Sequence, residues 1–300
     1  MALNKAVFQT RAKTAVVYAA IMLSGLFWNE WSFFLLFSLV HFGAWYEFQK
    51  LSSLIYPALQ WRLWFDRLLF PIIGWGVMLM ASAGSLNING FLLSDVGYWV
   101  VRIGLVLIPV NFFLDKQYGF KHLKQSVFGF FYISVSLALL INLRSGWLWS
   151  QTADSGFMAH ALSGFNGKTI CILLVVGIWI NDTMAYLVGS LIGRTPLTAW
   201  SPKKTWEGFW GGAFACFLLS IVLLSLHPEF KFWVFPILAL IIIVAATLGD
   251  LIQSKFKREA QVKDSGSLIP GHGGFYDRMD SVLYTAPFVN LFLIFVNYVS

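Results

Sequence analysis

The chain has 300 residues, of which 58% are hydrophobic and only 12% are charged, and its formal net charge is +7. Soluble domains contain about 45–50% apolar and about 25% charged residues, so this composition excludes a soluble globular protein and predicts an integral membrane protein. In such a protein the positive charge bears on membrane orientation and on anionic partners, and we do not expect nucleic acid to be a partner.

Nine apolar segments follow one another along the chain, each long enough, or nearly so, to cross the roughly 30 Å hydrocarbon core of a bilayer. They comprise residues 14–28, 31–48, 68–84, 98–114, 126–143, 169–192, 209–226, 232–251 and 282–299. No Pro/Gly-rich linker divides the chain, so we predict an all-α polytopic bundle that forms one transmembrane domain over residues 1–300. Cys171 and Cys216 both lie in these segments, without the spacing of a disulfide framework or a metal site.

Lysine and arginine are unevenly distributed over the connections between these segments. With the N-terminus inside, 17 of them fall on the cytoplasmic side and 3 on the outer side. Because cytoplasmic loops carry the excess of positive charge, this pattern supports nine spans, a cytoplasmic N-terminus and an external C-terminus. The polar segments 194–208 and 254–280 then both face the cytoplasm.

Two ionisable residues near the second span, His41 and Glu47, have two interpretations. They line a cavity or, as is more common, they sit at a span end in the membrane interface. The sixth span has an aspartate, Asp182, at its middle, where a charge costs roughly 2.5–3.5 kcal/mol and by default marks a functional site. Tyr186, Gly189 and Gly193 follow at helical spacing, so we expect one stripe that faces inward. The alternative is a structural hydrogen bond from Asp182 to a neighbouring helix.

The connection before the seventh span contains five polar residues suited to a polyphosphate, namely Ser201, Lys203, Lys204, Thr205 and Glu207. The hydroxyls can donate to phosphate oxygens, the lysines can balance their charge, and the glutamate can orient a lysine or support a metal ion indirectly. The same residues also fit an ordinary helix start with Ser201 as its N-cap and Pro202 in its first position. The two interpretations are compatible, because a helix N-terminus is itself an anion site.

The connection between the eighth and ninth spans is the most densely charged part of the chain. Its candidate site residues are Asp250, Ser254, Lys257, Arg258, Lys263, Asp264, His272, Gly273, Gly274, Asp277, Arg278 and Asp280. The glycines let the backbone approach a ligand, and two aspartates brought together by such a loop can hold Mg²⁺, which shares substrate phosphates. A juxtamembrane basic segment against lipid headgroups is the alternative, but it leaves the run His-Gly-Gly-x-x-Asp-Arg-x-Asp unexplained.

These segments resemble the CDP-diacylglycerol synthases, also called phosphatidate cytidylyltransferases. The long signature of that family, S-x-F-K-R-x4-K-D-x-G-x2-I-P-x-H-G-G-F-x-D-R-M-D, is complete from Ser254 to Asp280. The stretches S-P-K-K-T-W-E-G at 201–208 and N-D-T-x-A-Y at 181–186 resemble its upstream motifs. The resemblance covers residues 170–300, so we regard 166–300 as the catalytic half and assign no role to 1–165.

The resemblance implies a reaction of CTP with phosphatidic acid that gives CDP-diacylglycerol and pyrophosphate. It also implies a homodimer and a Mg²⁺-dependent site, with Asp250 and Asp277 as metal ligands and a K⁺ ion beside the Mg²⁺. In a bacterium the protein would be a multi-pass protein of the inner (cell) membrane, with its site open to the cytoplasm and to the lipid bilayer.

For this reaction we assign the candidate residues to two groups, one for catalysis and one for substrate binding. The groups assigned to catalysis are Asp182, Asp250, Lys257, Arg258, Lys263, Asp277 and Arg278. Those assigned to substrate binding are Ser201, Lys203, Lys204, Thr205, Glu207, Ser254, Asp264, His272, Gly273, Gly274 and Asp280. The attacking phosphate is already ionised near neutral pH, so a general base is not required.

Two other functions fit parts of the sequence. A CTP-dependent kinase of a lipid alcohol would use the same nucleotide but transfer its γ-phosphoryl group, and the complete signature favours the cytidylyltransferase over it. An organic-anion transporter with Asp182 as its midplane site is the alternative from another class. Transporters often show internal repeats in both halves, whereas here the polar chemistry lies in the C-terminal half.

Overall fold

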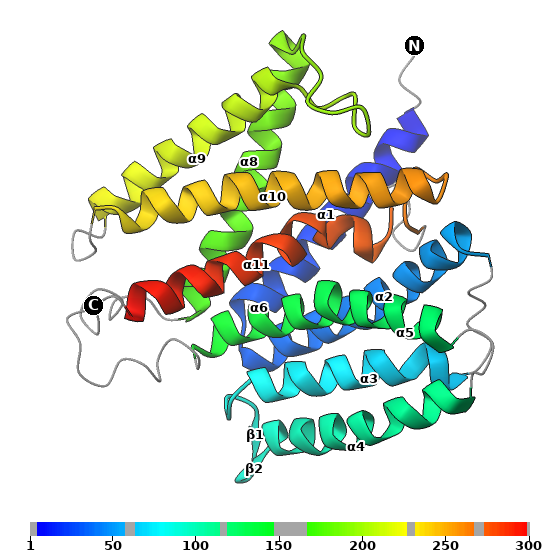
Figure 1. The fold of residues 1–300 in the computed structure, drawn as a ribbon. Helices are drawn as coiled ribbons and strands as arrows, with labels where there is room; N and C mark the ends of the chain where they lie inside the picture. The colour runs from blue at the N-terminus through cyan, green and yellow to red at the C-terminus, as the bar shows by residue number, and fades with distance from the viewer. Residues whose placement is uncertain are drawn as a thin grey trace. The chain divides into compact units, whose positions relative to one another are not determined.

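The computed structural model describes residues 5–57, 64–114, 119–146, 167–226, 232–266 and 273–298. These residues form helices almost throughout (Figure 1). The helices are α1 (Lys5–Phe27), α2 (Glu30–Ile55), α3 (Trp64–Ala81), α4 (Leu93–Leu114), α5 (Gly119–Gly129), the π-helix η1 (Phe130–Val135), α6 (Ser136–Ser145), α8 (Gly167–Ile192), α9 (Trp206–Leu226), α10 (Val234–Glu259) and α11 (Phe275–Tyr298). The strands β1 (Asn87–Ile88) and β2 (Phe91–Leu92) pair antiparallel between α3 and α4.

The helices confirm an all-α polytopic membrane protein. Six helical segments of the described chain are long and apolar enough to cross a membrane: Leu93–Val110, Phe120–Ser145, Gly167–Ile192, Trp206–Leu226, Val234–Glu259 and Phe275–Val296. Two shorter apolar helices cover Val16–Phe27 and Arg67–Ala81. Each predicted span falls on a helix, but the count of nine and the orientation of the termini stay predictions.

The chain divides into two compact units, which are described separately. Unit 1 consists of Met1–Ile141 and Phe256–Met279, and unit 2 consists of Asn142–Lys255 and Asp280–Ser300. Helices α10 and α11 therefore each contribute residues to both units.

The interior of unit 1 is built around α2, whose Phe37, Trp45 and Phe48 are completely or almost completely buried. His41 is buried as well, and its Nε2 lies 2.9 Å from Ser134 Oγ of η1, which also accepts a hydrogen bond from Trp45. The ring of His41 therefore has a polar partner inside the protein, while its position relative to the membrane interface stays a prediction.

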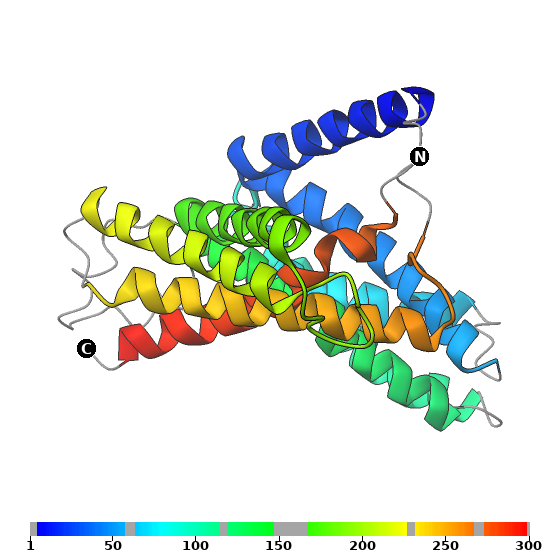
Figure 2. The same ribbon diagram turned by 90° about the horizontal axis from the view of Figure 1, so that it is seen from above.

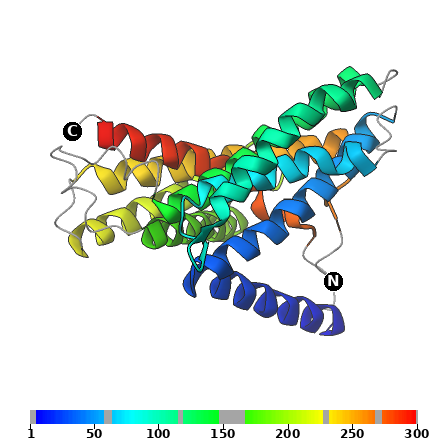
Figure 3. The ribbon, with the colours of Figure 1, turned by 90° about the horizontal axis from the view of Figure 1, so that it is seen from below.

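Unit 2 depends on close helix packing. Helices α8 and α9 contact each other along their lengths, and a Cβ on Gly212 would come within 2.6 Å of the Asn181 carbonyl oxygen. Small residues allow such approach where helices pack in a membrane. Within unit 2, the part of α11 drawn in red lies beside α10 (Figures 2 and 3), and the Ser281 hydroxyl donates to the Ala246 carbonyl oxygen at 3.2 Å.

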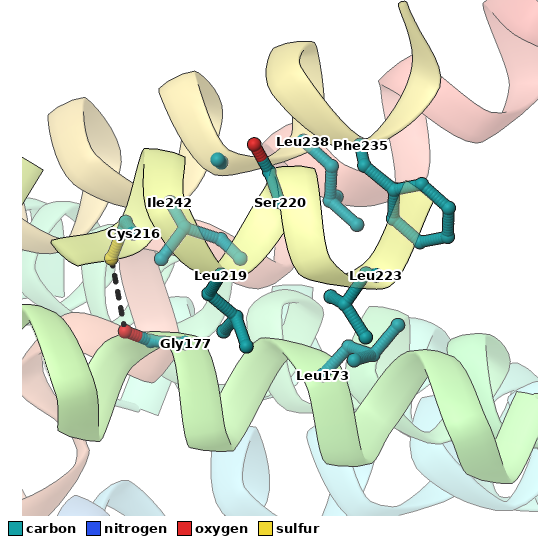
Figure 4. A pocket seen from close by; sticks show the side chains of 10 residues that line it. Leu173, Gly177, Cys216, Leu219, Ser220, Leu223, Phe235, Leu238 and Ile242 are labelled. Atoms are coloured by element: carbon teal, nitrogen blue, oxygen red, sulfur yellow. Dashed lines mark hydrogen bonds between the residues drawn. The ribbon is translucent and has the colours of Figure 1, made fainter. Parts of the chain in front are cut away.

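A small apolar cavity lies between α8, α9 and α10 (Figure 4). Leu173, Leu219 and Leu238 are among the residues that line it, and the Cys216 thiol points across to the Gly177 carbonyl oxygen at 3.5 Å. Cys171 and Cys216 are both buried and are not joined to each other by a disulfide, which agrees with their prediction as small apolar residues.

Candidate functional site

A larger cavity of about 700 Å³ opens in unit 2 between α8, the connection to α9, and α10. It is lined by residues from three separate predicted motifs: Asp182, Ser201, Lys203, Lys204, Thr205 and Asp250. Tyr186, Gly189 and Gly193 line it too, so the stripe on α8 borders this cavity, although Tyr186 is 74% exposed. The fold thus brings two lysines, two carboxylates and several hydroxyl groups to one hollow.

Lys204 is the electrostatic centre of this cavity. Its Nζ forms an ion pair with Asp250 Oδ2, and the carboxyls of Asp182 and Asp280 add to the negative potential around it. Burial disfavours the charged amine, but the carboxylates outweigh that cost and raise the pKa of Lys204 above its usual value. Lys204 is therefore a stable cation that can face a phosphate group.

The connection from α8 to α9 folds back as a short hairpin that presents the lysines. Pro196 pairs with Thr205 in an antiparallel bridge, and Leu197 N–H donates to the Lys204 carbonyl oxygen at 2.7 Å. A Cβ on Gly193 would lie 2.6 Å from Thr205 Oγ1, so only glycine fits this close turn.

Helix α9 begins later than the interpretation with Ser201 as N-cap predicts. Its first residue is Trp206, and Thr205 caps it by accepting a hydrogen bond from Gly208 N–H at 3.1 Å. Ser201 instead forms a turn in which its carbonyl oxygen accepts from Lys204 N–H at 3.0 Å. The capping prediction is wrong because the hairpin, with its own backbone hydrogen bonds, occupies the residues before Trp206.

Glu207 has a different position from the other residues of its motif. Its exposed carboxylate accepts hydrogen bonds from the backbone N–H groups of Arg194 and Thr195 and from the Thr195 hydroxyl, at 3.0 to 3.3 Å. It is not among the described residues that line the cavity. Glu207 therefore ties the start of the hairpin to the start of α9.

Two further predicted residues surround Asp250 within unit 2. Ser254, one turn later in α10, donates a hydrogen bond to Asp250 Oδ1 at 3.4 Å. Asp280 accepts a hydrogen bond from Ser281 N–H at 2.7 Å, and its carboxyl interacts directly with that of Asp250. Asp250 therefore lies in a polar environment that joins α10 to α11.

The Asp277 carboxylate lies at the start of α11, in unit 1. Lys257 Nζ donates to Asp277 Oδ1 at 2.7 Å, while Ser265 N–H and Gly274 N–H donate to Oδ2 at 2.8 and 3.1 Å. Gly273 has a φ of 82°, and a Cβ there would approach Asp277 Oδ2 to 2.7 Å. The carboxylate thus fixes both ends of the loop before α11.

The remaining charged residues of the signature are exposed, namely Arg258, Lys263, Asp264 and Arg278. The Arg258 guanidinium donates to the Val262 carbonyl oxygen at 3.0 Å, which shapes the end of α10. His272 lies outside the described residues, so its predicted part in shaping the loop stays a prediction.

Glu47 is the site residue that sequence reasoning missed. Its side chain is almost fully buried. Its carboxylate accepts hydrogen bonds from Ser265, which also binds Asp277, and from the first two N–H groups of α11, those of Phe275 and Tyr276. Donors more than 200 positions later in the chain surround this carboxylate inside the protein, while its predicted place at a span end stays a prediction. An acidic residue in an apolar helix was the only local signal.

The described residues fit Mg²⁺ only together with a phosphate ligand. No group of three or more His, Cys, Asp or Glu side chains in the described part of the chain is arranged to hold a metal ion. Mg²⁺ is usually bound by one or two carboxylates together with substrate phosphates. A carboxylate oxygen accepts about two hydrogen bonds, and Lys257 is the one donor found on Asp277 Oδ1 in the described chain. Asp250 of unit 2 and Asp277 of unit 1 each carry hard carboxylate oxygen atoms, and their role as a ligand pair stays a prediction.

Comparison with known proteins identifies the family. A model of the cytidylyltransferase family matches residues 9–296. The chain belongs to this family. The match includes the first half of the chain, which the sequence motifs alone left unassigned.

Several relatives of this family member carry the name phosphatidate cytidylyltransferase. The protein of Brucella abortus is 31% identical over 293 residues, which cover 95% of this chain and 92% of the relative. The protein of Staphylococcus haemolyticus is 34% identical over 205 residues, covering 67% of this chain and 73% of the relative. That of Synechocystis is 44% identical over 139 residues, covering 45% and 47% respectively.

Proposed function

We propose that the protein is a phosphatidate cytidylyltransferase, which converts CTP and phosphatidate into CDP-diacylglycerol and pyrophosphate. The observation that carries this proposal is the cavity of unit 2, which places Lys203, Lys204 and Asp250 together in a membrane protein of the cytidylyltransferase family. Relatives of that name in distant bacteria support the same substrates.

The reaction requires two polyanions to approach each other. A phosphate oxygen of phosphatidate attacks the α-phosphorus of CTP and forms the new P–O bond, while the bond from the α-phosphorus to the β-bridging oxygen breaks and pyrophosphate leaves with the electron pair. Because phosphoryl-type transfer depends mainly on positioning and charge stabilisation, the cavity needs cations and donors rather than a base.

The residues of unit 2 supply those groups. Lys203 and Lys204 neutralise phosphate oxygens, and the hydroxyls of Ser201 and Thr205 donate hydrogen bonds to them. Asp182 and Asp280 keep Lys204 charged and oriented. Lys257, Arg258, Lys263 and Arg278 are the further cations that the signature assigns to the phosphates, and Ser254 and Asp264 support them.

Mg²⁺, held by Asp250 and Asp277, would neutralise the phosphates of CTP and of the departing pyrophosphate. The family signature supports this ligand pair, and so does the donor type of both residues. The K⁺ ion beside the Mg²⁺ rests on the resemblance alone.

The proposed membrane arrangement has nine spans in one transmembrane domain, a cytoplasmic N-terminus and an external C-terminus. The excess of 17 Lys and Arg over 3 supports it. It places residues 194–208 and 254–280 on the cytoplasmic side, where CTP is dissolved. The membrane is the inner membrane of a bacterium, and the enzyme is a homodimer.

The test uses purified protein with phosphatidate, Mg²⁺ and CTP labelled separately at its α- and γ-phosphates. We expect only the α-label to enter the lipid, as CDP-diacylglycerol, and Asp277→Asn to prevent this. Label from the γ-phosphate in a lipid product would identify a lipid-alcohol kinase instead. Without lipid label from either position, CTP-independent uptake of an organic anion into vesicles would identify a transporter.

A further inference from the structure

Glu47 of α2 makes three hydrogen bonds within unit 1, one to Ser265 in the connection from α10 to α11 and two to the first two residues of α11. Its Oε2 accepts from the Ser265 hydroxyl at 2.6 Å and from Tyr276 N–H at 3.0 Å, and its Oε1 accepts from Phe275 N–H at 3.1 Å. The residue is only 1% exposed. A carboxylate buried to this degree is stable only when its oxygens are satisfied by donors, and here they are.

The partners of Glu47 define which side chain the position accepts. The hydroxyl of Ser265 and the two backbone N–H groups all act as donors toward it. A glutamine has the same shape, but its amide nitrogen would direct two N–H groups at other N–H donors. The position therefore requires an acceptor on both branches of the side chain.

Two glycines of the signature fit tightly around this carboxylate. A Cβ on Gly266 or on Gly274 would overlap the Glu47 oxygen atoms. Beside the polar contact, the Phe48 ring stacks on Phe256 with centroids 5.6 Å apart, and Tyr276 packs against Phe256. Glu47 and the residue after it thus hold both the loop and the end of α10.

Ser265 connects Glu47 to the predicted metal ligand. Its hydroxyl donates to Glu47, while its N–H donates to Asp277 Oδ2 at 2.8 Å. Asp277 also accepts from Gly274 N–H, next to the Phe275 N–H that binds Glu47. Both carboxylates therefore accept hydrogen bonds from Ser265 at one end of the loop and from neighbouring backbone N–H groups at the other end.

We propose that Glu47 is a positioning residue of the transferase site, which fixes the signature loop so that the Asp277 carboxylate is preorganised for Mg²⁺. This inference rests on the proposed function for the role of Asp277. It assigns a part in the reaction to the N-terminal half of the chain. Residues that orient metal ligands typically change metal affinity or activity by about 10–100-fold when replaced.

The experiment compares three variants in detergent or nanodiscs. Glu47→Gln replaces one of the two acceptor oxygens by an amide donor, and Ser265→Ala removes the hydroxyl link but keeps both backbone bonds to Glu47. Gln49→Met is the matched control on α2, because Gln49 donates to the Arg67 carbonyl oxygen and not to the loop. For each variant we would measure kcat, the KM for CTP, the Mg²⁺ concentration for half-maximal rate, and amide hydrogen exchange in peptides covering 256–281.

We expect Glu47→Gln to raise the half-saturating Mg²⁺ concentration about 10–100-fold, to lower kcat, and to speed exchange across the loop. Ser265→Ala should move the same quantities by a smaller factor, while Gln49→Met keeps the wild-type Mg²⁺ dependence. If Glu47→Gln and Ser265→Ala lower the melting temperature but leave the Mg²⁺ dependence unchanged, Glu47 is merely structural and the proposal fails.

The exchange measurement separates this proposal from the proposed function. If the wild-type protein makes no CDP-diacylglycerol, the proposed function fails. The positioning of Asp277 by Glu47 is still supported in that case if Mg²⁺ slows amide exchange in peptides covering 256–281 and Glu47→Gln abolishes this slowing. If the wild-type protein is active and the exchange of 256–281 is the same in Glu47→Gln, the positioning role is refuted.

Discussion

Two Lys–Asp pairs, one in each unit, show how the same chemistry is used in two environments. Lys204 and Asp250 line the large cavity, with side chains 33% and 21% exposed. Lys257 and Asp277 are 12% and 6% exposed, and Asp277 also accepts two backbone N–H groups. The first pair is open to a substrate, whereas the second is fixed by the loop that it holds.

The largest expected effect comes from the open pair. Asp250→Asn should lower the rate of CDP-diacylglycerol formation by on the order of 10²–10³-fold, because it removes the proposed metal ligand and leaves Lys204 without its ion-pair partner. Initial rates at saturating CTP would measure this. Lys255→Ala is the control, since Lys255 in the same helix lies over the Trp200 ring, 5.0 Å from its centroid, and does not line the cavity. Equal loss in both variants would contradict a special role for the cavity.

Around the second pair, Lys257 and Asp277, we expect a substitution to lower the stability of the protein and not only its activity. Gly274→Ala should destabilise the protein by about 1–3 kcal/mol, because the new methyl group would overlap the Glu47 carboxylate. Gly177→Ala is the matched control, since its nearest obstacle is the flexible end of Ile242 at 3.0 Å. Thermal unfolding in detergent measures both, and equal melting temperatures would show that the loop around Glu47 is not tightly packed.

The two regions also differ in how far the sequence predicts them. Lys203, Lys204 and Asp182 are recognisable from local patterns, since charges at a span end or at its middle indicate a site, and helical spacing alone aligns Asp182 with Gly189. Glu47 is not predictable in this way. Its donors lie more than 200 positions later, and nothing within a few residues of Glu47 distinguishes a buried acceptor from an interfacial carboxylate.

The helix start at Trp206 shows the same limit on a smaller scale. Ser201 and Pro202 form a good capping pattern by themselves, but the backbone pairing of Pro196 with Thr205 gives those residues to a hairpin. Backbone pairing between residues nine positions apart therefore selects the hairpin over a helix that starts at Ser201. The local sequence pattern does not reveal this pairing.

A smaller effect is expected at the edge of the open region, where Glu207 holds the hairpin. Glu207→Gln keeps one acceptor of two, so the hairpin should loosen without losing its lysines. We expect the KM for CTP to rise about three- to tenfold, because exposed hydrogen bonds contribute modestly, with kcat nearly unchanged. Steady-state kinetics tests this, and a large fall in kcat with an unchanged KM would instead place Glu207 in the chemical step.

The smallest effect is expected from a change of pH, because Lys204 should keep its charge and kcat/KM should not change through this residue. Burial opposes its charge, but Asp250, Asp182 and Asp280 raise its pKa above the usual value of about 10.4. A group with a raised pKa in the folded protein contributes its full stabilisation below its unfolded pKa and loses it only as pH rises through the folded pKa. Lys204 should therefore stay charged from neutral pH to about pH 9. Across that range the ratio of kcat/KM between wild type and Lys204→Arg should be constant, because arginine is always charged. A ratio that falls near pH 8 would mean that Lys204 loses its proton there and that the surrounding carboxylates do not hold its charge.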